Sequence, residues 1–527
     1  MNANAASQSA AANARGTAES LPPLAIGVLI LLCAAKFLLH AFTSLHRYGY
    51  FRDELYLLDC ARHLYWGYVD MAPLSAVYAK IALLLGGSLP ALRILPALAG
   101  TALVALTILI ARQLGGDRFA QALAGLCVLL VPVNMVMDDF LSMNSFEPLL
   151  WMGCVYILIR IIRTGDSKLW LWFGVLAGLG LENKHSTLFF GFAVFLAVTF
   201  TRLRREFAKP WIWLGGAIAL LIFMPNLVWQ IHRNFPTLQD LENVRRSGKN
   251  VVLSPPRFIL QQILMEQPIF AVFWLTGLVS LIAGAAKKFR LLGFTFIIFF
   301  ATLLILHGKD YYVAPIYPMM FAAGAVAVER WLARRSWAGA RLWPRAAIAT
   351  AVIVLGGLLI PLFTPMFSPR RYLAYADALH IHFTKTEVAT SGSLPQFLGD
   401  QFGWRSLVRQ IADIYNSLPP DERVKTGIWA GNYGEAGAVN LFGPAYDLPR
   451  AYSRHQNYWY WGPPPVAYTN LIVVQWSLQD VQDNCTSWQA FDHHSEFGMD
   501  EENTPIYLCR GAKFDIQKIW WHSHHWN

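Results

Sequence analysis

The stretch AAIATAVIVLGGLLIPLFTPMF occupies residues 346–367 and contains no charged residue. A helix of about 20 apolar residues crosses the hydrocarbon core of a bilayer, so this stretch is long enough to span a membrane. Similar uncharged runs lie at residues 119–137 and 211–229, and residues 21–45 contain Lys36 as their only charge. Core helices of water-soluble proteins rarely run so far without charge. The sequence therefore predicts a polytopic α-helical membrane protein.

The overall composition supports this prediction. The chain has 527 residues, of which 55% are hydrophobic and only 14% are charged, and its mean hydropathy is +0.37. A set of soluble domains of this length would carry more charge. The net charge of +10 does not indicate nucleic-acid binding, because the basic residues are concentrated in short connectors. Residues 1–20 are rich in Ala, Ser and Asn, which predicts a disordered cytoplasmic tail.

The connectors between the apolar runs fall into two alternating sets, one of which is strongly basic. By the positive-inside rule, the basic set faces the cytoplasm and the other set lies outside. Counting the runs between connectors predicts about 11 membrane helices, with the N-terminus in the cytoplasm and the C-terminal region outside. The basic connectors contain Arg112 and Arg118; Arg160, Arg163 and Lys168; Arg202, Arg204, Arg205 and Lys209; Lys287, Lys288 and Arg290; and Arg330, Arg334, Arg335, Arg341 and Arg345.

The predicted membrane body covers residues 21–367, and its segment 48–88 is neither a tight loop nor a clean span. Apolar positions in residues 51–65 recur at a helical spacing, and Trp and Tyr recur in residues 65–68. Both features are typical of helices that lie on the membrane interface. We therefore expect interfacial helices in this segment.

Residues 368–527 have the composition of a water-soluble domain. Strands are predicted at residues 426–430, 469–475 and 504–510, and a helix is predicted at 406–418. The segment 431–442 is expected to form a turn that leads into a helix. These elements indicate a small extracytoplasmic α/β domain. If it faces an oxidising compartment, Cys485 and Cys509 are candidates for a disulfide.

Polar residues of both charge signs gather at helix ends on the predicted outer face. This pattern suggests a site for an anionic, partly polar ligand. Structural explanations remain open: an acidic pair can cap a helix, and another can lie in a solvated turn. A lysine between two short apolar helices must pair, snorkel or bind an anion. The residues are Asp53 and Glu54; Asp138 and Asp139; Lys184 and His185; and Lys309, Asp310, Tyr311 and Tyr312.

Three segments of the membrane body resemble the bacterial branch of the protein O-mannosyltransferase family. They are FRDELYLLDCARHLYWGYVDMAPL (51–74), GLGLENKHSTL (178–188) and GKDYYVAPIYPMMFAAGA (308–325). This branch includes lipid A galacturonosyl- and aminoarabinosyltransferases, which have the GT-C fold. In the soluble domain, YGEAGA (433–438) and SRHQNYWYWGP (453–463) resemble segments of the same group. Where relatives often have Asp-His-Pro-Pro-Leu, this chain has Asp70, Met71, Ala72, Pro73 and Leu74.

The resemblance implies an inverting glycosyltransferase in the cytoplasmic (inner) membrane of a bacterium. Such an enzyme moves a sugar from a polyprenyl-phosphate donor to a cell-envelope acceptor on the outer face. The acceptor is lipid A, another glycan or a protein hydroxyl, and the protein acceptor is the less favoured of these. The chain would contact membrane lipids and would not bind nucleic acid.

The resemblance also implies roles for individual residues. In an inverting transfer a carboxylate removes the acceptor proton, and Asp53, with Glu54 beside it, matches the acidic motif of the family. Cations stabilise a departing lipid phosphate, for which Lys184, His185, Lys309, Tyr311 and Tyr312 are the candidates. Asp138 and Asp139 resemble the second acidic site, which would position hydroxyls or hold a divalent cation. Oxygen ligands favour magnesium or calcium, and the need for a metal stays open.

An aromatic run in the soluble domain has two interpretations. Packing of the domain onto the membrane body is one, and binding of the acceptor sugar on aromatic rings is the other. The residues concerned are His455, Tyr458, Trp459 and Trp461.

A transporter or flippase of lipid-linked sugars is the alternative function. It predicts inverted sequence repeats and polar residues at mid-membrane depth. The sequence gives no clear sign of either, so the glycosyltransferase is the favoured hypothesis.

Reporter fusions test the predicted topology. A reporter fused after Arg204 is expected in the cytoplasm, because this connector is basic, and one fused after Asp240 is expected outside. Alkaline phosphatase, which is active only outside, and a cytoplasm-dependent fluorescent protein provide the readout. Equal compartments for the two fusions would contradict the topology.

Overall fold

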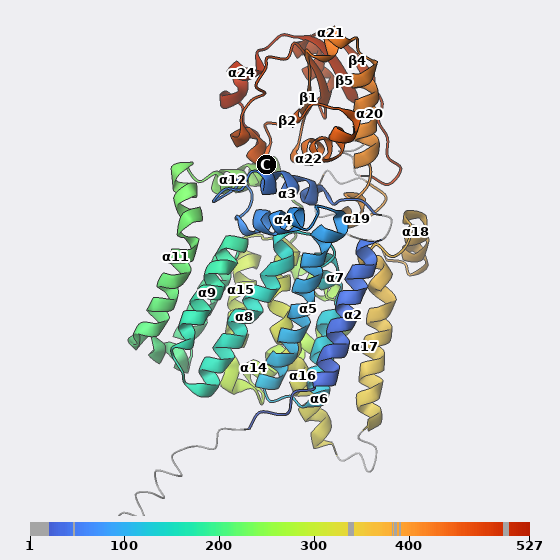
Figure 1. The fold of residues 1–527 in the computed structure, drawn as a ribbon. Helices are drawn as coiled ribbons and strands as arrows, with labels where there is room; N and C mark the ends of the chain where they lie inside the picture. Colours follow the sequence, from blue (N-terminus) through green and yellow to red (C-terminus); the bar gives the residue numbers. More distant parts are fainter. Residues whose placement is uncertain are drawn as a thin grey trace, which may run out of the picture.

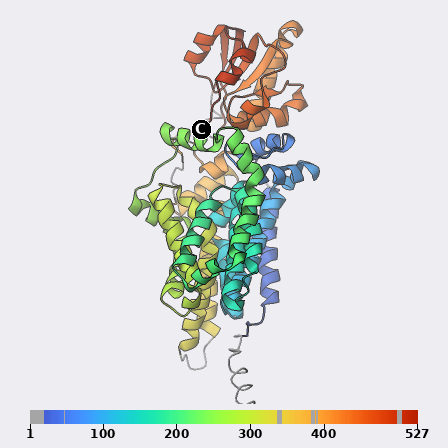
Figure 2. The same ribbon diagram turned by 90° about the vertical axis from the view of Figure 1, so that its left-hand side faces the viewer.

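The computed structural model describes residues 20–45, 48–335, 342–381, 383, 387–388, 392–498 and 505–526. Apart from Ser20, the predicted tail lies outside these residues. Figure 1 shows three levels: a bundle of long helices, short helices lying across one end of it, and a domain with a sheet beyond them. The view at 90° shows the same order (Figure 2). The predicted fold class, a polytopic helical body followed by a small α/β domain, is confirmed.

Within the described residues, seven helical segments are long and apolar enough to cross a membrane. The number rises to nine if each of two bent helix pairs is one span. These pairs are α10 (Thr187–Thr199) with η1 (Arg202–Ala208) and α13 (Pro255–Met265) with α14 (Pro268–Ile282). The seven are α2 (Ile26–Ser44), α5 (Leu89–Gln113), α8 (Met143–Thr164), α11 (Pro210–His232), Lys287–Ile305 with α15 (Arg290–Ile305), Asp310–Arg334 with η3 (Asp310–Ile316) and α16 (Tyr317–Arg334), and α17 (Leu342–Phe363).

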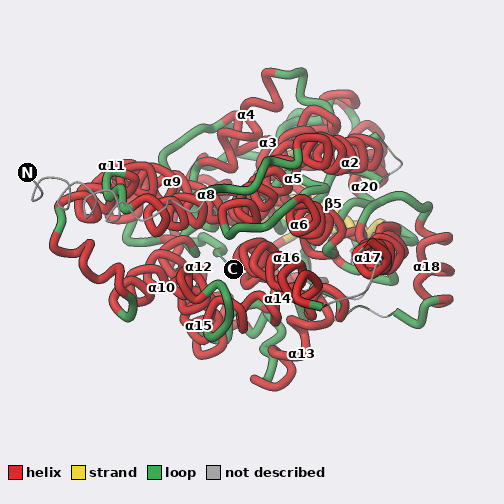
Figure 3. Tube along the Cα trace, turned by 90° about the horizontal axis from the view of Figure 1, so that it is seen from below, coloured by secondary structure: helices red, strands yellow, loops and turns green. Residues whose placement is uncertain are grey.

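Two shorter helices account for the difference from the predicted count. They are α6 (Arg118–Leu130), which α7 (Pro132–Met137) follows, and α9 (Leu169–Asn183). Figure 3 shows the bundle from below as an elongated body with α11 near one end and α17 near the other. The many spans are confirmed, and the number 11 stays a prediction that requires α6 and α9 to cross the membrane.

The segment 48–88 forms two helices across the end of the bundle, α3 (Arg52–Arg62) and α4 (Leu74–Leu84). The amphipathic pattern predicts one lipid-facing or solvent-facing side, but α3 is buried over most of its length. The reason is that the C-terminal domain covers the side that faces away from the bundle. Helix α12 (Pro236–Ser247) lies in the same layer.

The C-terminal domain contains a mixed sheet of five strands in the order β2-β1-β3-β5-β4. Strand β1 pairs in parallel with β2 and β3, and β5 pairs antiparallel with β3 and β4. The predicted strands and the predicted helix at 406–418 are present. The strands are β1 (Thr426–Ala430), β2 (Ala451–Tyr452), β3 (Asn470–Val474), β4 (Cys485–Phe491) and β5 (Ile506–Ala512), and the main helices are α18 (Pro369–Ala378), α20 (Trp404–Ser417) and α22 (Tyr433–Phe442). Cys485 and Cys509 form a disulfide between β4 and β5.

Two glycines allow α22 to lie directly on α3. A Cβ atom at Gly437 would lie 2.8 Å from the carbonyl carbon and oxygen of Leu55, and one at Gly434 would lie 2.7 Å from Cγ of Arg52. Real Cβ atoms do not approach backbone so closely, so side chains at these positions would push the helices apart. The YGEAGA segment therefore provides the surface on which the C-terminal domain meets the membrane body.

Replacement of Gly437 by valine tests this contact. The added side chain overpacks the helix interface, which typically costs about 1–3 kcal/mol. We expect a lower thermal midpoint of the detergent-solubilised protein and faster protease release of the C-terminal domain. Gly357→Ala is the control, because a Cβ there meets nothing within 4 Å. Equal behaviour of the two variants would contradict the close contact.

Candidate functional site

Glu54 lies at the centre of a buried hydrogen-bond network in the first turn of α3. Its carboxylate pairs with Arg93 of α5 at 3.1 Å, and both side chains are almost fully buried. It also accepts hydrogen bonds from the backbone N–H groups of Phe51 and Leu141, at 2.9 and 3.0 Å. The helix-capping alternative is thus confirmed for this residue, and Glu54 joins α3 to the membrane body.

Asp53, beside it in sequence, has different surroundings. One carboxylate oxygen, Oδ1, accepts a hydrogen bond of 2.9 Å from the hydroxyl of Tyr433 in the C-terminal domain. The side chain is only partly buried. Asp53 therefore lies at the boundary between the body and the domain.

The second acidic pair is buried against α2. Asp138 forms an ion pair of 2.7 Å with Lys36, and Asp139 accepts a hydrogen bond of 2.6 Å from Thr43. His40 lies 3.6 Å from Asp139. The solvated-turn alternative is wrong, because Asp138 and Asp139 are only 2% and 4% exposed. Lys36 is the only charge of the first apolar run, and a charge within a membrane span needs a partner. Lys36 was therefore the sequence signal that could have predicted a buried acid opposite it.

Lys184 lies in a polar pocket between α9 and α10, as expected. Its ammonium group contacts Glu147 at 2.9 Å and Asn144 at 2.8 Å. It also lies 4.3 Å from the ring centre of Tyr312, in cation–π geometry. His185 is hydrogen-bonded to Asn226 of α11 at 3.0 Å. The structure thus brings together two segments, 178–188 and 308–325, that are far apart in sequence.

A second group of charges lies closer to Asp53. Lys309 is 3.8 Å from Glu387, and Arg52 is 3.9 Å from the same carboxylate. Burial would raise the pKa of Glu387, but the positive charges of Arg52, Lys249 and Lys309 outweigh burial and lower it.

Tyr311 connects this group to the acidic motif. Its ring lies 6.0 Å from the ammonium group of Lys309, and its hydroxyl is near enough to Glu387 and Asp53 to feel their charges. The sequence analysis did not select Arg52 or Glu387. Arg52 could have been found from its place in the RDEL motif, whereas Glu387 lies in a segment without a motif.

Asp70 is a further acidic residue that the sequence analysis noted but did not assign to the site. Its carboxylate accepts a hydrogen bond of 3.0 Å from Tyr56 of α3. Burial and the nearby negative charges of Asp240 and Asp53 raise the pKa of Asp70 to about 7. The sequence signal that could have assigned Asp70 is that the acid is kept in residues 70–74, where the His and one Pro of the family pattern are missing. A carboxylic acid that titrates near neutrality is typical of functional sites.

The aromatic run packs against the membrane body. Tyr458 is buried and its hydroxyl donates a hydrogen bond of 2.6 Å to Asp59 of α3. Trp461 stacks on His63 at 4.4 Å between ring centres, and Trp459 donates to the carbonyl of Trp520. His455 is buried behind Tyr433. Packing on the membrane body accounts for the contacts of Tyr458 and Trp461, whereas Trp459 and His455 pack within the C-terminal domain. Acceptor binding by these residues stays a prediction.

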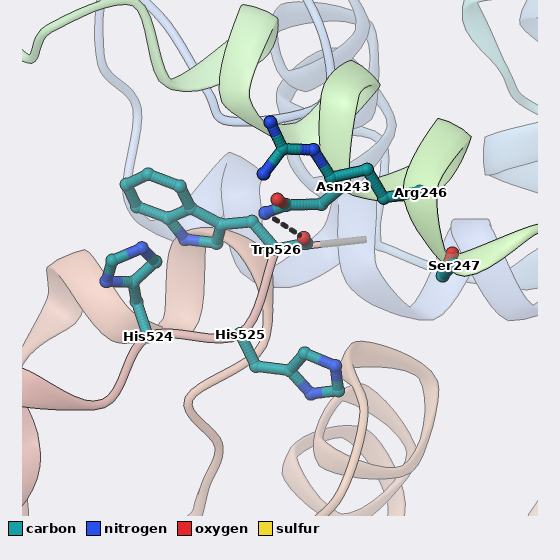
Figure 4. Close-up of a pocket in the computed structure, with 6 residues that line it drawn as sticks. All are labelled: Asn243, Arg246, Ser247, His524, His525 and Trp526. Carbon is teal, nitrogen blue, oxygen red and sulfur yellow. Dashed lines mark hydrogen bonds between the residues drawn. The ribbon is translucent and has the colours of Figure 1, made fainter.

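An open pocket lies beside this region, between α12 and the C-terminal tail (Figure 4). It has a volume of about 410 Å³ and contains none of the predicted site residues. Asn243 of α12 donates a hydrogen bond of 2.8 Å to the carbonyl of Trp526. The pocket is also lined by Arg246, Ser247, His524 and His525.

The described part of the chain contains no preformed cluster of metal ligands. No group of three or more His, Cys, Asp or Glu side chains there is arranged to hold an ion. A divalent cation would have to complete its coordination with other oxygens, for example from substrate. A divalent cation at this site therefore stays a prediction.

Asp70→Asn tests the shifted acid. The folded pKa of about 7 lies above the ordinary value near 3.9, so the folded protein holds more protons than the unfolded chain between these values. Stability therefore falls as pH rises through this window. We expect wild type to lose on the order of 1–3 kcal/mol more than Asp70→Asn between pH 4 and 8. Thermal midpoints in detergent measure this, with Asp413→Asn as control; parallel curves would contradict the shift.

Comparison with known proteins adds sequence and structural matches to this geometry. Residues 70–229 match the family model described as dolichyl-phosphate-mannose-protein mannosyltransferase. Comparison with curated protein sequences gave no significant match. The match contains segment 178–188 and the end of segment 51–74, so the family resemblance is confirmed over these residues, and segment 308–325 lies outside it. Nothing in the comparisons supports the flippase alternative.

Two solved structures of ArnT from Cupriavidus metallidurans are similar over nearly the whole chain. The form bound to undecaprenyl phosphate is 14% identical with a TM-score of 0.58, and the apo form is 15% identical with a TM-score of 0.57. Each match covers 92% of this chain and 98% of ArnT. The arabinofuranosyltransferase AftD from Mycobacteria is 14% identical with a TM-score of 0.52, covering 92% of this chain and 40% of AftD.

At identities this low, the comparison shows that the fold is shared. The reaction has to be argued from the residues of the candidate site. The chain is a multi-pass membrane protein with the GT-C glycosyltransferase fold, and over residues 70–229 it has the sequence pattern of the dolichyl-phosphate-mannose-protein mannosyltransferase family.

Proposed function

We propose that this protein is an inverting glycosyltransferase that moves a sugar from a polyprenyl-phosphate donor to a cell-envelope acceptor. The observation that carries the proposal is the position of Asp53, a partly exposed carboxylate at the junction of the membrane body and the C-terminal domain. Cationic groups and tyrosines that suit a lipid phosphate lie near it. The matched family, named for a dolichyl-phosphate sugar, and ArnT bound to undecaprenyl phosphate support this donor class.

Asp53 is the proposed base. A carboxylate accepts the proton of the attacking hydroxyl, so it must be reachable by the acceptor. Glu54 does not meet this requirement as well, because it is fully buried and both its oxygens contact Arg93. We therefore narrow the predicted pair to Asp53 as the base and Glu54 as the residue that anchors its helix.

The donor phosphate is proposed to bind near Lys309, Arg52 and Tyr311. Negative charge grows on the phosphate as the sugar leaves, and nearby cations stabilise that charge. The contact of Lys309 to Glu387 is long, at 3.8 Å, so a phosphate oxygen can compete for Lys309. Arg52 lies between two carboxylates, 3.9 Å from Glu387 and 3.7 Å from Asp400, and would add positive charge beside the phosphate. Lys184 with Tyr312 would form a second cationic position. Lys184 contributes less in this proposal because Glu147 already neutralises it.

The proposed location is the bacterial cytoplasmic membrane with the C-terminal domain outside. The basic connectors support this orientation, because they lie at the end of the bundle opposite the domain (Figure 1). A lipid or glycan hydroxyl of the cell envelope is the favoured acceptor, and a protein hydroxyl is the less favoured one. A divalent cation, magnesium or calcium, stays part of the proposal only as an optional component of the site.

Asp53→Asn tests the proposed reaction. Asparagine keeps the shape and the hydrogen bond from Tyr433 but cannot take up the proton. General-base contributions are typically about 10²–10⁴-fold, so sugar transfer should fall by at least about 100-fold. A strain lacking the protein is complemented with each variant, and envelope glycolipids are compared by mass spectrometry for the loss of one sugar unit.

Asp413→Asn is the control for this experiment, because Asp413 is an exposed carboxylate on α20, away from the site. Membrane levels of all variants are compared by immunoblot. Restoration of the glycolipid by Asp53→Asn at the wild-type level would exclude Asp53 as the base. No change in any glycan between the deletion strain and wild type would contradict the enzyme itself.

A further inference from the structure

Tyr433 connects the C-terminal domain to the acidic motif of the membrane body. It is the first residue of α22, and its hydroxyl donates a hydrogen bond of 2.9 Å to Oδ1 of Asp53. The two residues are 380 positions apart in sequence. The C-terminal domain therefore contacts the proposed base directly.

The side chain of Tyr433 is packed among two aromatic rings and a guanidinium group. The ring of His455 lies parallel to it, with 5.1 Å between centres and 5° between planes. The ring of Tyr56 from α3 lies 4.9 Å away on the body side. The guanidinium of Arg52 lies 5.6 Å from the ring centre of Tyr433. These contacts restrict the directions in which the hydroxyl can point.

The backbone of Tyr433 is also fixed. Its N–H group donates a hydrogen bond of 3.2 Å to Nδ1 of His455, and a capping box between Asn432 and Glu435 surrounds this residue at the start of α22. The N–H group of His455 in turn donates to the hydroxyl of Ser453 at 3.1 Å. His455, which was predicted to bind the acceptor, thus contacts both the backbone and the ring of Tyr433 and holds this residue in place.

The hydrogen bond leaves one oxygen of Asp53 for substrate. In the part of the chain that the structure describes, Oδ2 has no hydrogen-bond donor, whereas Oδ1 is occupied by Tyr433. A base that can rotate freely loses part of its effectiveness, because proton transfer needs a fixed geometry.

We propose that Tyr433 is a positioning residue that orients Asp53, so that the C-terminal domain completes the active site. This inference rests on the proposed function of Asp53 as the base. It assigns to the domain a part in the reaction that neither its fold nor its sheet indicates.

The competing explanation is that the bond only docks the domain. Asn440 of the same helix α22 offers a comparison, because its side-chain N–H group donates a hydrogen bond of 2.6 Å to Asp59 of α3. Tyr433→Phe and Asn440→Ala each remove one side-chain hydrogen bond between the domain and α3. Only the first of these bonds involves the proposed base.

The experiment measures the initial rate of sugar addition to the endogenous envelope acceptor in isolated membranes, with a lipid extract of the same strain added in increasing amounts as the source of donor. For Tyr433→Phe we expect the maximal rate to fall by about 10-fold or more. The donor KM should not change, because the hydroxyl contacts the proposed base. Asn440→Ala should lower the thermal midpoint without this loss of maximal rate.

Three outcomes decide the proposal. A lower maximal rate at an unchanged donor KM for Tyr433→Phe alone supports it. An unchanged maximal rate for Tyr433→Phe, with Asp53→Asn inactive, overturns the role of Tyr433 and leaves the proposed base intact. Equal losses of maximal rate for Tyr433→Phe and Asn440→Ala mean that the effect comes from docking and overturn the proposal as well. Full activity of Asp53→Asn would instead remove the proposed function itself.

Discussion

The ion pair between Glu54 and Arg93 is the interaction on which the rest of this structure depends. Arg93 also donates to the carbonyl of Gly49 and to the side chain of Gln401, at 2.8 and 3.0 Å. Together with the bond from Leu141 to Glu54, these contacts join α3, α5, the segment after α7 and the start of the C-terminal region. Removal of one partner of such a buried pair leaves an uncompensated charge and typically costs about 3–5 kcal/mol. The pair therefore fixes the N-terminal turn of α3.

The position of α3 decides what the adjacent residues can do. Because Glu54 faces the body, Asp53 faces the boundary with the C-terminal domain, and Asp59 two turns later meets the same domain through Tyr458 and Asn440. Gly434 and Gly437 bring α22 of the C-terminal domain into close contact with α3, opposite the membrane body. The helix is thus enclosed by two parts of the chain, and the candidate site lies on neither part alone.

Several features could be predicted from local sequence because their causes are local. The long uncharged runs, the basic connectors and the strands near residues 426–430 and 469–475 follow from hydropathy and residue type. The acidic motif could be located by its pattern, but its two members could not be separated. Nothing in the sequence Asp53-Glu54 tells which carboxylate meets Arg93, since that depends on how α3 is rotated against α5.

The sequence by itself determined the membrane body, the small α/β domain after it and the motifs that contain most of the candidate site, but not the segment of Glu387. The tertiary structure alone decided the partners: Lys36 with Asp138, Lys184 with Glu147, Arg52 and Lys309 with Glu387, and Tyr433 with Asp53. The physical reason is that hydropathy and propensity act within a few turns of chain, whereas a buried charge takes its partner from whichever element the packing places within about 4 Å.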